Sequence, residues 1–479
     1  MCRRHQSIPD EDHQSVNVQW LCACKLKGSI YITPLLKNPT LDKSDINSYR
    51  PISNLSVLSK LLEQAVCTQL VSYHNINSLT PRNQSAYHRR HSTETALAFV
   101  FSELISALDD GNLTLMALLD LSAAVDCVDH NILLSRLNIT YGIGNMVRSW
   151  VSSYLSGRTQ SVWVDGTSSH AETMQYGVPQ GSVMGLLLFL LYTADLDVIV
   201  TNQGLMLHFY ADKSQLYLYC RPDQIQQLQV ITIDCIMDID SWVKSNRLQL
   251  NRVKAEFVWV ATPCWLHYFN DNPFILGNTI VKPTTNARNF GVMRNQDFSM
   301  VFHINKLFQS CFYSLRHIQS IWRSLTFDAT RKLICSLIYL CVDYCNSLFA
   351  WLLAQSIDLL QSILNSSAHL ACSLHKYDHI TPTLYDRLHW QQGFIYKLCL
   401  LTFKGLQGEA LPYIIELCLQ ACQQHRVMLP QALLCCWQTA YRPADSHRFL
   451  KKGIRLRRSV GLEQPAFWTE TVTCHFVQD

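Results

Sequence analysis

Two aspartates stand at positions where a folded chain holds a side chain rigidly, and carboxylate oxygens are ligands that divalent metals favour. Asp212 lies within 205–219 (LMLHFYADKSQLYLY), whose alternating apolar residues predict two strands, a four-residue turn and Asp212 at the tip. Residues 113–119 (LTLMALL) form a continuous apolar run of strand length, and Asp120 follows it directly. Carboxylates at the ends of neighbouring strands can converge, so this pair is a candidate metal site.

A third stretch of interest is 177–182 (GVPQGS). Its two glycines and its proline predict a loop whose backbone can come close to a ligand. Ser182 is then expected to cap a following apolar helix. A further helix is expected to begin near Ser122, just after Asp120, with one apolar face formed by Ile132, Leu133 and Leu137.

In this order, the three stretches resemble the palm motifs of reverse transcriptases from non-LTR retrotransposons, the long interspersed element type. The matching segments are ALLDLSAAVDCVDH, GVPQGSVMGLLLFLLYTADL and YADKSQLY, and with flanking matches the resemblance covers roughly residues 30 to 420. It implies a mixed α/β (α+β) fold, the right-hand polymerase, with fingers, an antiparallel-sheet palm and a helical thumb. It also implies RNA-directed DNA polymerisation, with an RNA template, a DNA primer and deoxynucleoside triphosphates as partners.

The resemblance assigns roles to individual residues. Asp120 and Asp212 would hold two Mg²⁺ ions that stabilise the attacking and leaving oxygens. Substrate contacts would come from Arg50, Arg89, Val125, Gly177, Gln180, Gly181 and Ser182. Family members usually carry an aromatic ring where Val125 stands, and that ring blocks the ribose 2′-hydroxyl. Asp126 and Asp129 are interpreted as helix-start and structural carboxylates rather than metal ligands.

Three of these assignments keep a plainer alternative. Lys254 matches a family position that could protonate the leaving pyrophosphate, but the pattern favours a surface lysine at a strand start. Arg50 and Arg89 are contacts to phosphate by the resemblance, because a guanidinium pairs well with it. Both are also compatible with solvated charges at the start of an element.

Lys213 is the main departure from the family pattern, because the hairpin there usually reads Tyr-Ala-Asp-Asp and this chain has Tyr-Ala-Asp-Lys. At ~6 Å and an effective dielectric constant of ~20, two unit charges interact by about 3 kcal/mol. Replacing −1 by +1 beside a divalent ion multiplies this to an upper estimate on the order of 10 kcal/mol. We therefore expect a degenerate copy with weakened metal binding and little or no activity. A catalytically dead nucleic-acid-binding protein and an unstable pseudogene product are the alternatives.

Helical spacing predicts three further buried stripes. One follows Asn54 or Ser56 and comprises Leu58, Leu61, Leu62, Ala65 and Leu70. A second, capped by Ser92, comprises Leu97, Val100, Phe101, Leu104 and Leu108. A third, opened by Pro222, comprises Ile225, Leu228, Cys235, Ile239 and Trp242.

Composition limits the class of protein. The 479 residues are 48% hydrophobic and 16% charged, which suits a large core divided into several units. The net charge of +4 permits nucleic-acid binding without deciding it. The 19 cysteines are scattered through apolar segments and are expected to be reduced thiols of an intracellular protein, in cytoplasm or nucleus. We see no signal peptide, and the longest apolar run, 183–194, is short for a membrane span.

We expect five regions along the chain. These are a poorly defined segment 1–28, fingers 29–110, a palm 111–300 with finger insertions, a helical thumb and C-terminal region 301–425, and a basic, partly disordered tail 426–479. The tail holds the densest cluster of basic residues, 451–458, which suits nonspecific contact with phosphates. No segment resembles an endonuclease domain, so we expect that this chain does not nick its own target DNA.

Overall fold

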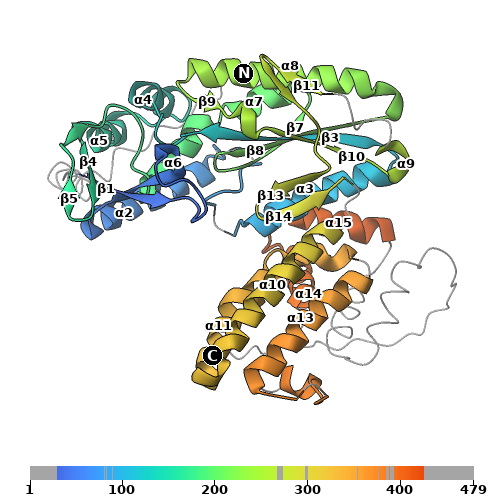
Figure 1. Ribbon diagram of the computed structural model, residues 1–479. Coiled ribbons are helices and arrows are strands. Elements are labelled where there is room, and N and C mark those ends of the chain that lie inside the picture. The colour runs from blue at the N-terminus through green and yellow to red at the C-terminus, as the bar shows by residue number, and fades with distance from the viewer. Residues whose placement is uncertain are drawn as a thin grey trace, which may run out of the picture.

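A computed structural model describes residues 30–79, 81, 83–88, 90–266, 273–296, 300–352, 354–375, 377–384, 388 and 393–425. Within these residues lie two five-stranded sheets, one of them with helices on both faces, and a helical bundle (Figure 1). They correspond to the fingers, palm and thumb of the predicted fold. The predicted segment 1–28, the basic tail 426–479 and Arg89 lie outside the described residues.

The fingers sheet joins two parts of the chain. Its order is β2-β1-β4-β5, with β6 paired to β4. β1 and β4 run parallel, and the other pairs are antiparallel. The strands are β1 (Ile30–Leu36), β2 (Tyr49–Asn54), β4 (Thr159–Val164), β5 (Thr167–Ser168) and β6 (Glu172–Thr173). β4, β5 and β6 lie within 111–300, the range expected for the palm, and so match the finger insertions expected there.

Helix α2 (Val57–Ile76) follows the fingers strands and begins at Ser56, whose hydroxyl accepts a hydrogen bond from the Ser59 N–H. The predicted buried face of this helix is confirmed at Leu70 and at Leu62, which packs against the main core, but is wrong at Leu58 and Leu61. Leu58 and Leu61 are each 62% exposed, whereas the buried positions are Ser59, Glu63, Cys67, Leu70 and His74. The helix is turned this way because its polar residues make contacts inside the protein, which apolar periodicity does not detect.

The palm sheet is antiparallel, in the order β10-β3-β8-β7, with β9 paired to the end of β3. Helix α8 lies on one face, and α3 and the thumb lie on the other (Figure 1). The elements are β3 (Leu113–Ser122), β7 (Met206–Tyr210), β8 (Lys213–Cys220), β9 (Gln249–Leu250), β10 (Glu256–Val260), α3 (Thr93–Asp109) and α8 (Ile225–Ser245).

β3 is apolar without alternation because both of its faces are covered. Leu113, Leu115 and Leu119 belong to the main core, whereas Met116 packs with Val100 and Leu104 of α3. The predicted stripe of α3 and its Ser92 cap are confirmed, and so is most of the stripe of α8, where Leu228, Cys235 and Ile239 are buried.

The helix expected to begin near Ser122 begins later. β3 runs on to Ser122 because Leu121 and Ser122 pair with β9. Turns follow, and α4 (His130–Ile139) starts at Asp129, whose carboxylate accepts from the N–H groups of Asn131 and Ile132. Asp129 is thus the helix-start carboxylate that was expected. α5 (Asn145–Leu155) follows it.

Helix α6 (Val183–Thr193) is almost entirely buried, and α7 (Leu196–Asn202) continues it after a short break. Together, as Val183–Asn202, they are long and apolar enough to cross a membrane, unlike the shorter run considered from sequence. The most apolar part of this stretch is 61% buried inside the protein, as in a core helix.

Two short hairpins lead from the palm to the thumb, β11 (Phe274–Leu276) with β12 (Thr279–Val281) and β13 (Asn286–Asn289) with β14 (Val292–Asn295). The thumb core also includes Leu97 and Phe101 of α3, so α3 packs against both units. The thumb helices are α10 (Val301–Ile321), α11 (Phe327–Ile334), α12 (Leu340–Asp343), α13 (Ala354–Cys372), α14 (Gly393–Leu406) and α15 (Pro412–His425).

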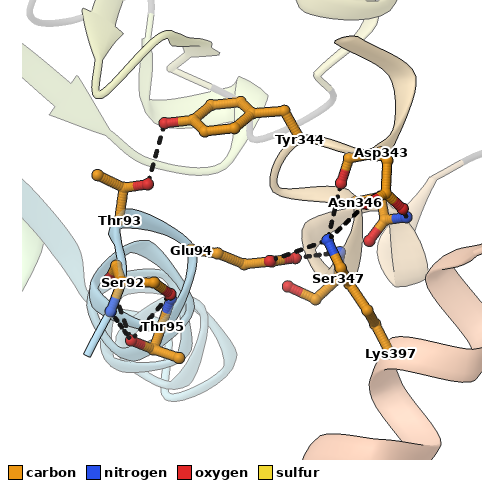
Figure 2. Close-up of polar contacts among 9 residues, drawn as sticks. All are labelled: Ser92, Thr93, Glu94, Thr95, Asp343, Tyr344, Asn346, Ser347 and Lys397. Carbon is orange, nitrogen blue, oxygen red and sulfur yellow. Dashed lines mark hydrogen bonds and ion pairs between the residues drawn. The ribbon is translucent and has the colours of Figure 1, made fainter. Parts of the chain in front are cut away.

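Polar contacts join the N-terminus of α3 to the thumb (Figure 2). The Lys397 ammonium of α14 lies 3.1 Å from a Glu94 carboxylate oxygen and 3.4 Å from an Asp343 carboxylate oxygen. The Tyr344 hydroxyl donates to the Thr93 hydroxyl at 3.0 Å. These contacts hold the thumb to the helix that supports the palm sheet.

Candidate active site

The predicted hairpin and its four-residue turn are present. β7 ends at Tyr210 and β8 begins at Lys213, and these two residues pair directly. The turn is therefore Tyr210 to Lys213, with Ala211 and Asp212 as its two central residues. Asp212 stands at its tip, where paired strands on both sides hold the backbone.

Asp120 lies near the end of β3, directly opposite Lys213 on β8. Side chains opposite one another in an antiparallel pair point to the same face of the sheet. This is also the face on which Met116 packs against α3, since residues two and four positions apart on a strand share a face. The carboxylate of Asp120 therefore lies on the side of the sheet where the thumb lies (Figure 1).

The two oxygens of the Asp120 carboxylate differ in their surroundings. Oδ2 lies 3.4 Å from the Lys254 ammonium. Oδ1 is buried and has no hydrogen-bond partner among the described residues. The backbone around it is fixed, because the Asn251 N–H donates to the Asp120 carbonyl at 2.9 Å. Asp120 thus retains one oxygen without a hydrogen-bond partner among the described residues.

Burial raises the pKa of Asp212, and the nearby charge of Asp120 raises it further, whereas Lys213 and Lys254 act in the opposite direction. Four charged groups therefore lie close together in this site, namely the carboxylates of Asp120 and Asp212 and the ammonium groups of Lys213 and Lys254. Two carboxylates and two ammonium groups largely cancel, so the site attracts a cation much less than the carboxylate pair alone would.

The two carboxylates of this site could hold a divalent metal ion. The free Oδ1 of Asp120 and the carboxylate of Asp212 suit one divalent ion, since oxygen donors are what such ions prefer. Within the described residues, no group of three or more histidine, cysteine, aspartate or glutamate side chains is placed to hold a metal. Lys213 stands where a further acidic donor would be needed, so the side chains present do not fit a two-metal site.

The loop 177–182 packs closely on its own chain. Gly177 has a φ of +80°, and a Cβ there would lie 2.6 Å from the Asp126 carbonyl oxygen. Gly181 has a φ of +109°, and its Cβ would lie 3.1 Å from the Ser53 carbonyl oxygen. The glycines are therefore required by contacts within the protein. Gln180 joins these contacts, because its carbonyl accepts from the Ser53 N–H at 2.7 Å.

Ser182 is buried, and its hydroxyl accepts from the Gly185 N–H at 2.8 Å, which confirms the predicted helix cap. That contact directs the side chain into the protein. Val125 is half-buried, and its carbonyl accepts from the Val178 N–H at 3.0 Å. Val125 therefore lies beside this loop. Arg50 is exposed on β2 of the fingers sheet, opposite Leu35.

Sequence reasoning missed Glu63 of α2. This carboxylate is 1% exposed, and one of its oxygens accepts from the Val183 N–H at 2.8 Å. Its other oxygen accepts from the Ser59 hydroxyl at 3.1 Å. An acidic group at a helix N-terminus stabilises the helix, so Glu63 anchors α6 and the loop before it. A single glutamate on a helix otherwise reads as a solvent-exposed charge.

Gln84 was also missed. Residues 83–85 lie along the free edge of β7, where the Phe209 N–H donates to Asn83 at 2.9 Å and the Ser85 N–H donates to Phe209 at 3.0 Å. The Gln84 side-chain oxygen accepts from Ala86 at 2.9 Å and from Ala211 at 3.4 Å. Ala211 has a φ of +59°, which costs an L-residue roughly 1–2 kcal/mol. Gln84 therefore supports a strained turn next to Asp212.

Comparison with known proteins identifies the family of the chain. The family described as reverse transcriptase (RNA-dependent DNA polymerase) matches residues 39–287. The chain is 26% identical over 281 residues to the probable RNA-directed DNA polymerase from transposon X-element of Drosophila melanogaster, which is 58% of this chain and 30% of that protein. It is 30% identical over 195 residues to the polymerase from mobile element jockey of the same fly, 40% of this chain and 21% of that protein.

The matched regions are thus less than a third of these relatives. Among solved structures, a telomerase from Candida albicans in complex with a telomeric RNA fragment aligns with 96% of this chain and 74% of its own. The TM-score of that alignment is 0.42 and the identity 12%.

Proposed function

The chain belongs to the reverse transcriptase family, and we propose that it is an RNA-directed DNA polymerase of a non-LTR retrotransposon whose catalytic rate is greatly reduced. Its substrates are an RNA template, a DNA primer and deoxynucleoside triphosphates. The observation that carries this proposal is the convergence of Asp120 and Asp212 on one side of the palm sheet, with Lys213 directly opposite Asp120.

Reverse transcriptases use divalent metal ions. In this chain Asp120 and Asp212 would hold one such ion, Mg²⁺, which when bound supplies positive charge to the transferring phosphate. Lys254, which is ion-paired with Asp120, would give a proton to the leaving pyrophosphate. Arg50 on the fingers sheet would contact phosphate, and the 177–182 loop would support the nascent base pair through its contacts with Val125.

A polymerase-shaped protein that binds template and primer without catalysis is the second candidate. The ion pair between Lys254 and Asp120 favours it, because that ammonium occupies one of the few oxygens that a metal would need. In this case the charges of the two carboxylates and the two lysines cancel one another. The protein would act inside the cell, where RNA templates are present.

Primer extension on an RNA template separates the two candidates. The chain is assayed with an annealed DNA primer, deoxynucleotides and increasing Mg²⁺, beside an Asp212→Asn variant. We expect slow extension by the parent and none by the variant, with equal affinity of both for the duplex. Equal background rates in both proteins, with duplex binding intact, would favour the second candidate.

A further inference from the structure

The thumb contains a cavity whose lining residues all follow Asp120 and Asp212 in sequence. It opens between the C-terminal halves of α10 and α13 and has a volume of about 630 Å³. Residues that line it include Phe312, Leu315, Arg316, Trp322, His369 and His375. Binding sites for small organic ligands have volumes of roughly 300–1,000 Å³. The cavity is therefore large enough for such a group, and neither Asp120 nor Asp212 belongs to its lining.

One side of the cavity is apolar and aromatic. Leu315 is buried at 6% exposure and belongs to the thumb core. Phe312 is fixed by Phe308, with the ring centroids 4.5 Å apart. Trp322, in the short turn after α10, remains 37% exposed. A rigid ring beside an exposed indole offers planar surfaces on which a nucleobase can stack.

The polar lining is basic. Arg316 is exposed and has no ion-pair partner among the described residues. The lining also holds His369 and His375, and none of its residues is acidic. The His369 Nδ1 atom is buried without a hydrogen-bond partner in the part of the chain that the structure describes. Arg316 favours a ligand with negative charge, and the histidines with Gln319, Ser366 and Ser373 offer it hydrogen bonds.

We propose that this cavity binds one unpaired nucleotide, with its base against Trp322 and Phe312 and its phosphate against Arg316. A planar base and an anionic phosphate together match the aromatic residues and the arginine of the lining. The nucleotide is either part of a single strand or free in solution. The site is separate from the proposed polymerase reaction and requires neither metal nor primer.

Photocrosslinking tests the site directly. The full chain is irradiated with a single-stranded oligouridylate carrying 5-iodouracil, in the presence of a metal chelator, and the crosslinked peptides are identified by mass spectrometry. We expect crosslinks on the peptides that contain Phe312 or Trp322. Competition by unlabelled oligouridylate but not by excess UMP assigns the site to a strand, and competition by both assigns it to a free nucleotide.

Arg316→Glu should lower the yield of these crosslinks about tenfold. Arg323→Glu is the matched control, because it makes the same charge change at an exposed position just beyond Trp322 that does not line the cavity. It should change the yield by less than about twofold. Crosslinks absent from the thumb, or equal losses in the two variants, would overturn the proposal. Failure of primer extension would leave this result unaffected.

Discussion

Asp120 and Lys213 lie directly opposite one another on β3 and β8, so the residue after Asp212 presents its ammonium group on the face that carries the Asp120 carboxylate. Lys254 adds a second cation 3.4 Å from the same carboxylate. A unit charge at ~6 Å contributes about 3 kcal/mol at an effective dielectric constant of ~20. Two ammonium groups therefore offset part of the negative charge of the Asp120 and Asp212 carboxylates.

Stability should fall as the pH falls below neutrality. Burial lowers the pKa of His74 and of His208 from 6.5 to about 4. Above pH 6.5 both are neutral in folded and unfolded chains. As pH falls towards 4, only the unfolded chain takes up these protons, so stability is lost. Between pH 6.5 and about 5, each histidine should cost about 2 kcal/mol of unfolding free energy.

Urea denaturation at these two pH values measures the loss. Burial also lowers the pKa of His303 to about 4, so three histidines contribute to the loss. His208→Gln should therefore remove about a third of it, whereas His379→Gln, at an exposed position, should leave it unchanged. A pH response that is the same in His208→Gln and in the parent would contradict this account.

Glu63→Ala should destabilise the protein by about 2–4 kcal/mol, because it leaves the Val183 N–H and the Ser59 hydroxyl without their partner inside the protein. Chemical denaturation measures the change. Gln64→Ala, one residue away and exposed, should cost less than about 0.5 kcal/mol. Similar losses in both variants would mean that Glu63 does not anchor α6.

The elements with strong local signals could be predicted from sequence. The hairpin around Asp212 and the helix after Ser92 each combine periodicity with a turn or cap signal, and both are present. The start of α4 and the buried face of α2 could not be predicted in the same way. They depend on pairing of Leu121 with β9 and on the contact of Glu63 with α6, which join residues far apart in sequence.

The candidate site follows the same rule. The positions of Asp120 and Asp212 follow from local patterns, whereas the ion pair of Asp120 with Lys254 and the support of Ala211 by Gln84 depend on the folded arrangement.

Gln84→Ala should reduce extension about tenfold in a Lys213→Asp background, because Ala211 then lacks a partner that supports its strained conformation. Duplex affinity should not change, since Gln84 is buried. Single-turnover extension and a duplex-binding titration measure the two quantities. Loss of both together would indicate general unfolding rather than a displaced Asp212.

Val125→Phe in the same background should raise the preference for deoxyribonucleotides over ribonucleotides about tenfold, equivalent to about 1.4 kcal/mol. The ring would fill volume that a 2′-hydroxyl needs, and Val125 lies beside the 177–182 loop. Competing incorporation of the two nucleotide types gives the ratio. An unchanged ratio would mean that Val125 does not line the sugar pocket.

We predict that Lys213 suppresses catalysis by the carboxylate pair of Asp120 and Asp212. The most direct measurement is Mg²⁺-dependent primer extension on an RNA template by Lys213→Asp. Two controls accompany it, Lys332→Asp, which makes the same charge change on thumb helix α11, and Lys213→Asp combined with Asp120→Asn. We predict extension at least about a hundredfold above the parent, equivalent to about 2.7 kcal/mol, in Lys213→Asp alone. Extension no faster than that of the parent, in a folded protein that binds the duplex, would contradict the claim.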